Sequence, residues 1–190
     1  MVKVDGRTTR GLNNRKLIVQ ALLELIREGF VSPTAEMVSA RAGVGLRTVF
    51  RHFKDMETLY REITGEVDAI VAPVLATPVQ GDTWQEKLMH AIERRANMFE
   101  QLAPIQAANL AHLHESAFLR ERQAQSVALQ RMLLQAFLPS HVVKNEAVFE
   151  TLDLLLSIES WLRLRKEQQL NVEQAKDVLR KGIKQLITGL

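Results

Sequence analysis

The sequence predicts an all-α fold of about nine helices. Apolar residues recur at helical spacing through most of the chain, and no stretch shows the sustained apolar–polar alternation of a sheet strand. Gly and Pro residues stand where such segments should end. With 190 residues, 46% apolar and 25% charged, the chain can build a core and suits one compact domain or two small ones.

The first three helices are expected close together in the sequence. The first should follow Asn13 or Asn14, either of which could cap it, and should stop at Gly29. The second and third flank a tight turn and are expected at about 32–41 and 45–53.

Proline residues divide the remainder into further helices. Asp55 should cap a fourth helix that ends before Pro73, and the loop expected at 73–82 is the best candidate for a domain boundary. A fifth helix should end near Leu102, before Pro104 opens a sixth. Three more are expected at about 116–137, 142–166 and 172–186.

Charge is unevenly distributed along the chain. Residues 1–62 hold 11 Lys or Arg and 7 Asp or Glu, a formal charge of +4, whereas the remaining 128 residues total −1. A basic front on a near-neutral body favours a polyanionic partner at the N-terminal end. No apolar run approaches the roughly 20 residues of a membrane span, and the polar start lacks the apolar core of a secretion signal. We therefore expect a cytoplasmic protein with no membrane partner.

The stretch ARAGVGLRTVFRHF, residues 40–53, has many hydrogen-bond donors and no acid. Gly43 suits the left-handed backbone of a tight turn. An apolar stripe can pack on the first two helices, and the opposite side carries four donors. The stripe is Leu46, Val49, Phe50 and Phe53, and the donors are Arg47, Thr48, Arg51 and His52. A helix-turn-helix places its second helix in the DNA major groove with this layout, although an ordinary amphipathic helix behind a Gly turn would look similar.

The run TAEMVSARAGVGLRTVFRHFKDMETLY, residues 34–60, resembles the DNA-binding module of the TetR family of bacterial transcriptional regulators. The matching features are Val38-Ser39, the turn Ala42–Val44, Thr48-Val49 with an aromatic residue next, and His52-Phe53 before a new helix. The resemblance implies a DNA-binding domain at 1–62 and a helical ligand-binding and dimerisation domain at 63–190. It implies a repressor that a small molecule releases from a double-stranded DNA operator.

The expected DNA contacts follow from this resemblance and from the donors on the third helix. Arg47 and Arg51 can each fork onto guanine O6 and N7. Phe50 and Met56 replace the family's usual Tyr and Lys, which removes two phosphate contacts, and Lys54 can substitute for one. Periodicity places Leu46 on the buried stripe, but the resemblance places it near DNA, where a thymine methyl would be its contact. The full set is Thr34, Gly45, Leu46, Arg47, Thr48, Phe50, Arg51, His52 and Lys54.

Basic residues near the N-terminus could extend this surface. They could form an arm or flank that follows the DNA backbone, and a solvated tail is the alternative for the first two of them. The residues are Lys3, Arg7, Arg10, Arg15 and Lys16.

The middle of the chain is expected to hold the ligand, by resemblance, in a helical cage of bulky apolar and polar side chains. Plain core packing is the alternative for each of them. The set is Trp84, Met98, Phe99, Asn109, His112 and Phe118. His112 and His114 are two residues apart and point in different directions on a helix, so we expect no metal site.

The last two expected helices resemble the family's paired dimerisation helices. Two such helices from each of two chains can form a four-helix interface of a homodimer, and the alternative is that they face only their own core. The expected interface residues are Leu152, Leu155, Trp161, Leu179 and Ile183.

The residues give no sign of an enzyme. There is no Cys nucleophile, no phosphate-binding Gly loop and no metal pair at helical spacing, and the serines lack an arrangement of His and acid that would suggest activation. We expect no cofactor and no catalytic residue. The alternative function is a helical small-molecule-binding protein or enzyme that does not regulate transcription.

Overall fold

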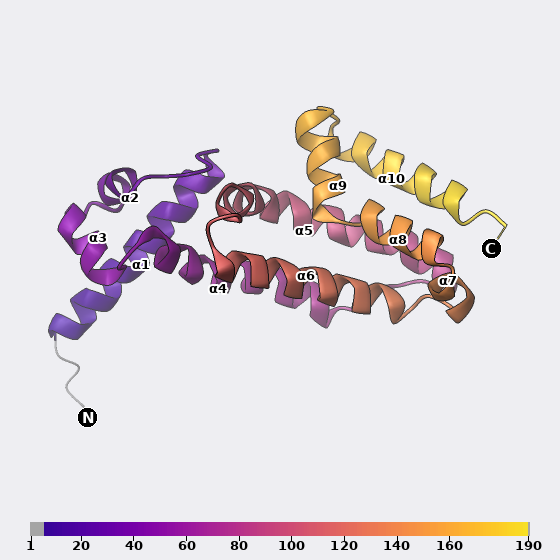
Figure 1. Ribbon diagram of the computed structural model, residues 1–190, viewed down its shortest axis with the longest axis horizontal. Helices are drawn as coiled ribbons and strands as arrows, with labels where there is room; N and C mark the ends of the chain where they lie inside the picture. Colours follow the sequence, from indigo (N-terminus) through magenta and orange to yellow (C-terminus); the bar gives the residue numbers. More distant parts are fainter. Residues whose placement is uncertain (1–5, 190) are drawn as a thin grey trace, which may run out of the picture. The chain divides into compact units, whose positions relative to one another are not determined.

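The structure, a computed structural model, describes residues 6–189, without the side chains of residues 6–10 and Met56. The described residues form ten α-helices and one π-helical segment and contain no strand, which confirms the all-α class (Figure 1). The elements are α1 Gly6–Arg27, α2 Ala35–Ala42, α3 Leu46–His52, α4 Met56–Ala76, α5 Trp84–His112, α6 Ala117–Gln135, α7 Ser140–Lys144, α8 Glu146–Leu155, α9 Ile158–Leu162, η1 Arg163–Glu167 and α10 Val172–Leu186.

The chain divides into two compact units. Unit 1 is Met1–Ala69 together with Pro104–Arg120, and unit 2 is Ile70–Ala103 together with Glu121–Leu190. Helices α4 and α5 therefore contribute residues to both units. The division into domains at residue 62 stays a prediction.

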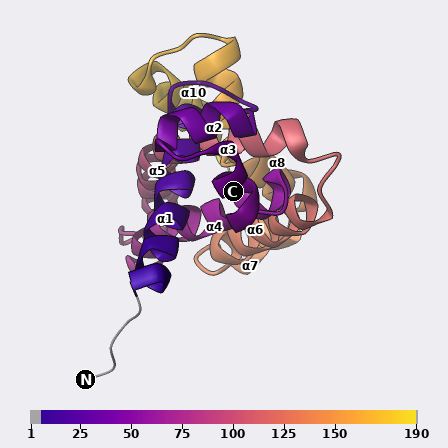
Figure 2. The same ribbon diagram turned by 90° about the vertical axis from the view of Figure 1, so that its left-hand side faces the viewer.

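Unit 1 is built on the first three helices, which Figure 2 turns toward the viewer. Apolar residues one turn apart on α1 are completely buried, and they pack with Val38 of α2 and Val49 of α3. The buried side chains of α1 are Ile18, Ala21, Leu22, Leu23, Leu25 and Ile26. Leu59 and Ile63 add the buried face of α4.

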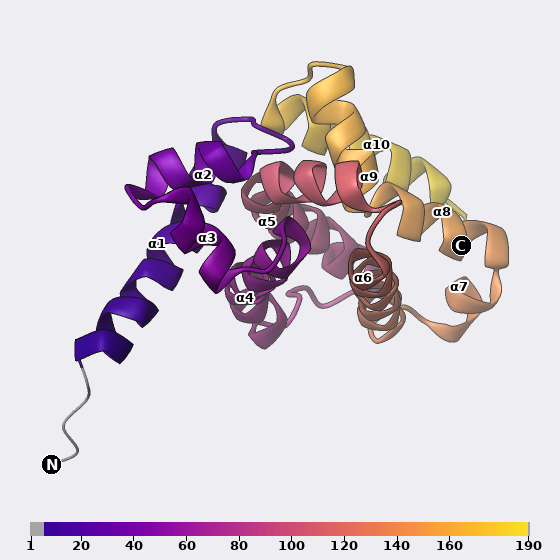
Figure 3. The same ribbon diagram turned by 60° about the vertical axis from the view of Figure 1, so that its left-hand side comes forward.

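Unit 2 buries large apolar side chains from α5, α6, α8, α9 and α10. Figures 1 and 3 show α8 and α10 running alongside each other. Glu100 of α5 accepts hydrogen bonds from the indole Nε1 of Trp161 and from Nε of Arg165, each at 2.8 Å. The buried core side chains include Leu88, Ile92, Leu134, Leu152, Trp161 and Ile183.

The predictions that one helix ends before Pro73 and another before Pro104 are wrong. Helix α4 continues through Pro73 to Ala76, and α5 continues through Pro104 to His112. Pro73 lies in the last turn of α4, where the Thr77 hydroxyl donates to its carbonyl at 3.0 Å. Around Pro104, burial of α5 side chains on both sides outweighs the local cost of proline in a helix, which is about 3 kcal/mol.

The other differences concern caps. Helix α1 begins at Gly6 and runs through both asparagines that were expected to cap it, because no strong helix breaker precedes them. The helix expected at 142–166 is instead divided, because two polar side chains cap new helices inside it. Asn145 accepts from the N–H of Val148 at 3.4 Å, and Ser157 accepts from the N–H of Ser160 at 3.1 Å.

Candidate nucleic-acid interface

The turn between α2 and α3 is closed by hydrogen bonds on both sides of Gly43. Gly43 has a φ of 66°, in the left-handed region that glycine adopts readily, and its N–H donates to the carbonyl of Ala40 at 3.3 Å. The Ser39 hydroxyl donates to the carbonyl of Val44 at 2.7 Å, and the N–H of Val44 donates to the carbonyl of Ser39 at 3.2 Å. These contacts fix the direction in which α3 leaves α2.

Both ends of α2 are tied down. At its start, the Thr34 hydroxyl accepts from the N–H of Met37 at 3.3 Å, which is an N-cap contact. Thr34 is exposed, so its own O–H can still point outward toward a phosphate. At its other end, Arg41 makes two parallel hydrogen bonds of 2.7 Å to the carboxylate of Glu28, just after α1.

The apolar stripe of α3 is buried along only one edge. Val49 and Phe53 are 2% and 1% exposed and lie in the core of unit 1, as expected. Leu46 and Phe50 are 36% and 50% exposed, so the periodicity-based prediction that they are buried is wrong. Leu46 is accessible, as the position near DNA implied by the resemblance requires, and its contact with DNA stays a prediction.

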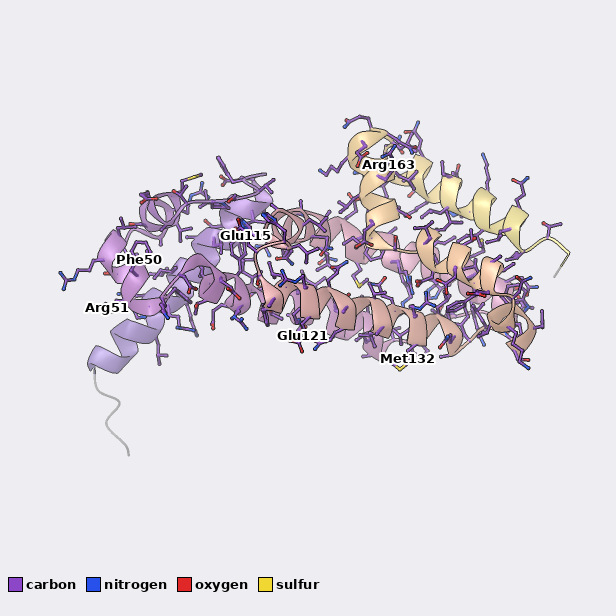
Figure 4. All side chains as sticks on the ribbon, in the orientation of Figure 1. Phe50, Arg51, Glu115, Glu121, Met132 and Arg163 are labelled. Carbon is purple, nitrogen blue, oxygen red and sulfur yellow. The ribbon has the colours of Figure 1, made fainter. Side chains whose placement is uncertain are left out.

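The two arginines of α3 are available for a partner. Arg47 and Arg51 are exposed, and neither makes a hydrogen bond or ion pair with any described residue; Figure 4 marks Phe50 and Arg51 on this helix. Thr48 is half-buried beside them, and Gly45 caps α3 from an extended conformation without a side-chain contact. The helix therefore presents two unpaired guanidinium forks on its accessible side, and their base contacts stay a prediction.

His52 is arranged differently from the other predicted contacts. Its Nε2 is buried without a partner among the described residues, and the side chain is half-buried. Burial, followed by the charges of Arg51 and Arg15, lowers the pKa of His52, so the ring is neutral near pH 7. A phosphate contact would need the other ring nitrogen or a rotation of the ring, because Nε2 is buried.

The segment after α3 combines an exposed cation with a capping acid. Lys54 makes no hydrogen bond or salt bridge with a described residue, and its charge acts on the neighbouring Asp55; its exposure suits the expected phosphate contact. Asp55 Oδ1 accepts from both the hydroxyl and the N–H of Thr58, each at 2.7 Å, and so caps α4. These hydrogen bonds lower the pKa of Asp55, which keeps a negative charge beside the expected phosphate site.

Of the expected basic arm, Arg15 is engaged within unit 1. It donates to Glu62 Oε1 at 2.6 Å and to the His52 carbonyl at 3.2 Å, and its guanidinium lies 4.6 Å from the centre of the Phe53 ring. Lys16 is exposed. Lys3 and the side chains of Arg7 and Arg10 lie outside the described residues.

The six expected ligand residues are divided between the two units. In unit 2, Phe99 is a core residue, Met98 is half-buried, and Trp84 meets the His141 ring edge-on with ring centres 6.5 Å apart. In unit 1, Asn109 is half-buried and Phe118 lies beneath the Arg61 guanidinium at 4.1 Å. Trp84 and Phe118 thus have partners within their own units, and a ligand role for these residues stays a prediction.

The sixth, His112, pairs with Tyr60 in unit 1. Their ring centres are 4.9 Å apart, and His112 Nε2 and the Tyr60 hydroxyl are both buried without a partner among the described residues. Burial raises the pKa of Tyr60 to about 12. Sequence reasoning missed Tyr60, since a single Tyr on an apolar helix face reads as core.

Sequence reasoning also missed the charged centre of unit 2. Arg95 of α5 donates to the carbonyl of Leu156 at 2.7 Å and to the carbonyl of Gln130 at 3.4 Å. Burial lowers the pKa of Arg95 to about 10, against the opposing charge of Asp153. The sequence has two consecutive arginines here, Arg94 and Arg95, and nothing in the pattern indicates that Arg95 is directed into unit 2.

The expected dimer residues lie mostly in the core of their own chain. Leu152, Trp161, Leu179 and Ile183 are at most 5% exposed, and Leu155 is half-buried. The large apolar side chains that are exposed on α8 and α10 are Leu154, 62% exposed, and Val178, 46% exposed. The run of three leucines at 154–156 could have indicated an exposed leucine. Consecutive residues point about 100° apart around a helix, so the three side chains cannot all face the same core.

Two further properties bear on the possible partners. Among the described residues, no three His, Cys, Asp or Glu side chains gather closely enough to hold a metal ion. Within the same part of the chain, every helix is too short or too polar to span a membrane.

Comparison with known proteins gives a family match for the N-terminal module and a shared fold for most of the chain. Residues 17–63 match the family model for bacterial regulatory proteins of the tetR family. Among curated proteins, no sequence matches this chain. SCO7518 of Streptomyces coelicolor A3(2), described as a candidate transcriptional regulator, is 19% identical with a TM-score of 0.64, over 92% of this chain and 98% of that one. A candidate TetR-family regulator from Rhodococcus sp. is 17% identical with a TM-score of 0.61, over 91% and 98%. At these identities the two structures show a shared fold.

Proposed function

We propose that this chain, whose residues 17–63 match the family model for bacterial regulatory proteins of the tetR family, is a homodimeric repressor released from its operator by a small molecule. The family match supports a DNA-binding transcription regulator. The direction of regulation, the ligand and the dimer belong to the proposal.

The observation that carries DNA binding is the pair of unpaired arginines on α3. Elsewhere in the described chain, Arg41, Arg131, Arg165 and Arg180 each hydrogen-bond a carboxylate. Arg47 and Arg51 make no such pair with a described residue, lie one helical turn apart, and extend from a helix whose orientation the Gly43 turn fixes. Guanine in the major groove offers the two acceptors that a guanidinium fork fits.

Dimerisation supplies the affinity that one short recognition helix lacks. Two linked modules bind two half-sites with an effective concentration that raises affinity without new contacts. The half-sites would lie about 34 Å apart, one turn of DNA. Leu154 and Val178 offer a second chain accessible apolar surface on α8 and α10.

Ligand control is proposed to act through α4. This helix begins directly after the recognition helix and continues from unit 1 into unit 2. A ligand bound in unit 2 releases DNA only if it favours the state in which α3 is misplaced for DNA. A coupling of about 1–3 kcal/mol would change DNA affinity about 5–150-fold, and operator DNA would weaken ligand binding by the same factor.

A gel-shift titration tests the DNA-binding function, with the promoter region beside the chain's own gene as probe and random duplex as competitor. Arg47→Lys and Arg51→Lys keep the charge but lose the fork, so they should weaken cognate binding and leave random binding nearly unchanged. Lys54→Ala should weaken both and flatten the salt dependence. If wild-type protein prefers no sequence, the DNA-binding proposal fails and the alternative of a helical small-molecule-binding protein gains.

A further inference from the structure

The recognition helix carries an accessible apolar edge beside its arginines. Leu46 and Phe50 are one turn apart and are 36% and 50% exposed, while Val49 and Phe53 form the buried edge. Because successive helix residues are about 100° apart, the order around α3 is Val49 and Phe53, then Leu46 and Phe50, then Arg47 and Arg51. The exposed apolar pair thus lies between the core and the two unpaired guanidiniums.

A single exposed apolar side chain on a protein surface is ordinary. Two large ones at positions i and i+4, bordering the cations of the same seven-residue helix, form a continuous strip that shares the partner of those cations. Neither side chain can donate or accept a hydrogen bond, so the strip contributes nothing to phosphate binding. The partner group that fits it must be apolar and must lie beside hydrogen-bond acceptors.

Among the groups on the floor of the DNA major groove, the thymine 5-methyl is the apolar one. Guanine O6 and N7, which suit the neighbouring arginines, lie on the same floor. Helix residues four apart are separated by about 6 Å along the axis, which corresponds to between one and two base-pair steps of about 3.4 Å. One helix can therefore place two apolar side chains over thymines on nearby base pairs.

We propose that Leu46 and Phe50 read thymine methyl groups in the operator half-site, next to guanine contacts from Arg47 and Arg51. This inference rests on the proposed DNA-binding function and adds a base preference to it. The half-site should hold two thymines within two base-pair steps of each other, close to a guanine. Phe50 then contributes specificity for thymine over cytosine at one of these positions.

The experiment begins with selection of the preferred duplex from a random pool by wild-type protein. Each thymine of the selected half-site is then replaced by uracil, which removes only the methyl group. At one or two positions we expect the dissociation constant to rise about fourfold, the effect of losing one buried methyl. Cytosine and 5-methylcytosine at the same positions should differ by a similar factor, since they too differ only in the methyl.

Variants assign each methyl to its side chain. Phe50→Ala should abolish the uracil penalty at one position and Leu46→Ala at the other, with folding checked by circular dichroism. Phe30→Ala is the matched control, because Phe30 is 46% exposed in the loop after α1 and should leave every uracil penalty unchanged.

The outcomes separate this inference from the function on which it rests. If no sequence is enriched in the selection, DNA-binding specificity itself fails. If a sequence is enriched but uracil is tolerated at every position, methyl reading is wrong while the regulator function stands. A uracil penalty that persists unchanged in both Ala variants would likewise overturn the assignment to Leu46 and Phe50.

Discussion

Ser39 and Val44 are joined by two reciprocal hydrogen bonds across the helix-turn-helix turn. The Ser39 hydroxyl donates to the Val44 carbonyl at 2.7 Å, and the Val44 N–H donates to the Ser39 carbonyl at 3.2 Å. Ser39 is only 9% exposed, so water cannot easily replace its hydroxyl. This pair, with the left-handed Gly43 between its members, sets the angle at which the recognition helix leaves α2.

Removing the Ser39 hydroxyl should destabilise the protein. Ser39→Ala deprives the Val44 carbonyl of a donor, and we expect the free energy of unfolding in urea to fall by about 1 kcal/mol. Tyr60→Phe is the matched control, because it also removes a buried hydroxyl, but one without a partner among the described residues. It should leave stability unchanged or raise it. Equal losses in both variants would contradict the role assigned to the Ser39 bond.

Two glycines should respond to alanine in opposite directions. In Gly43→Ala the added methyl group meets no atom within 4 Å, but alanine must adopt a φ of 66°. We therefore expect the free energy of unfolding to fall by about 1–2 kcal/mol and DNA binding to weaken. Gly65→Ala lies inside α4 with equally open surroundings and ordinary helical φ, and should stabilise the protein by about 0.5–1 kcal/mol. Thermal unfolding of both variants checks the pair. A neutral Gly43→Ala would show that the turn tolerates a side chain.

The sequence predicted the helix-turn-helix turn and the last helix well, because the signals for both are local. The Gly43 turn and the last helix, expected at about 172–186, depend on neighbouring residues, and the structure has both. Pro73 and Pro104 were expected to end helices for the same local reason. Tertiary burial, which a local pattern does not contain, carries α5 through Pro104, whereas Pro73 lies in the last turn of α4, where the residues that follow are largely exposed.

The candidate site shows the same limit at the level of side chains. Helical periodicity assigned Leu46 and Phe50 to the core, but only one edge of a seven-residue helix can be covered by α1 and α2. His52 was assigned to the donor face, yet its Nε2 is buried in unit 1. Which edge of an amphipathic helix is covered depends on how the helices cross, and a single sequence does not contain that angle.

His52 should make stability depend on pH between about 5.5 and 7. Its folded pKa is lowered by burial and by two arginines, so the unfolded chain binds the proton first as the pH falls through its ordinary value of about 6.5. Stability is therefore highest above that value and declines below it until the folded ring is also protonated. Thermal unfolding at pH 7.5 and 5.5 should show a smaller decline for His52→Gln than for wild type. The same decline in both proteins would assign it to other groups.

Asp55 should oppose DNA binding while stabilising α4. Asp55→Ser retains an oxygen that can accept from the Thr58 N–H but removes a negative charge beside Lys54. We expect tighter binding to cognate and random DNA at low salt, a gain that shrinks as salt is raised, and nearly unchanged stability. Asp82→Ser, which removes an exposed acid of unit 2, should not tighten binding. Unchanged affinity for Asp55→Ser would place phosphate away from the start of α4.

The exposed apolar surface of α8 and α10 gives the sharpest test of the proposed dimer. Leu154 is 62% exposed within one chain, so Leu154→Glu should be tolerated by the folded monomer. In a dimer it would bury an unpaired carboxylate, which is strongly unfavourable.

Sedimentation should therefore show a folded Leu154→Glu monomer, with operator affinity reduced to that of a single half-site contact. Val178→Glu should behave alike, whereas Met132→Glu, on the α6 surface and 58% exposed, should stay dimeric. Leu152→Glu is a different case: this side chain is completely buried in its own chain, so the variant should fail to fold rather than dissociate. A stable dimer of Leu154→Glu would exclude this part of α8 from the interface, and the paired half-sites would then need another means of linkage.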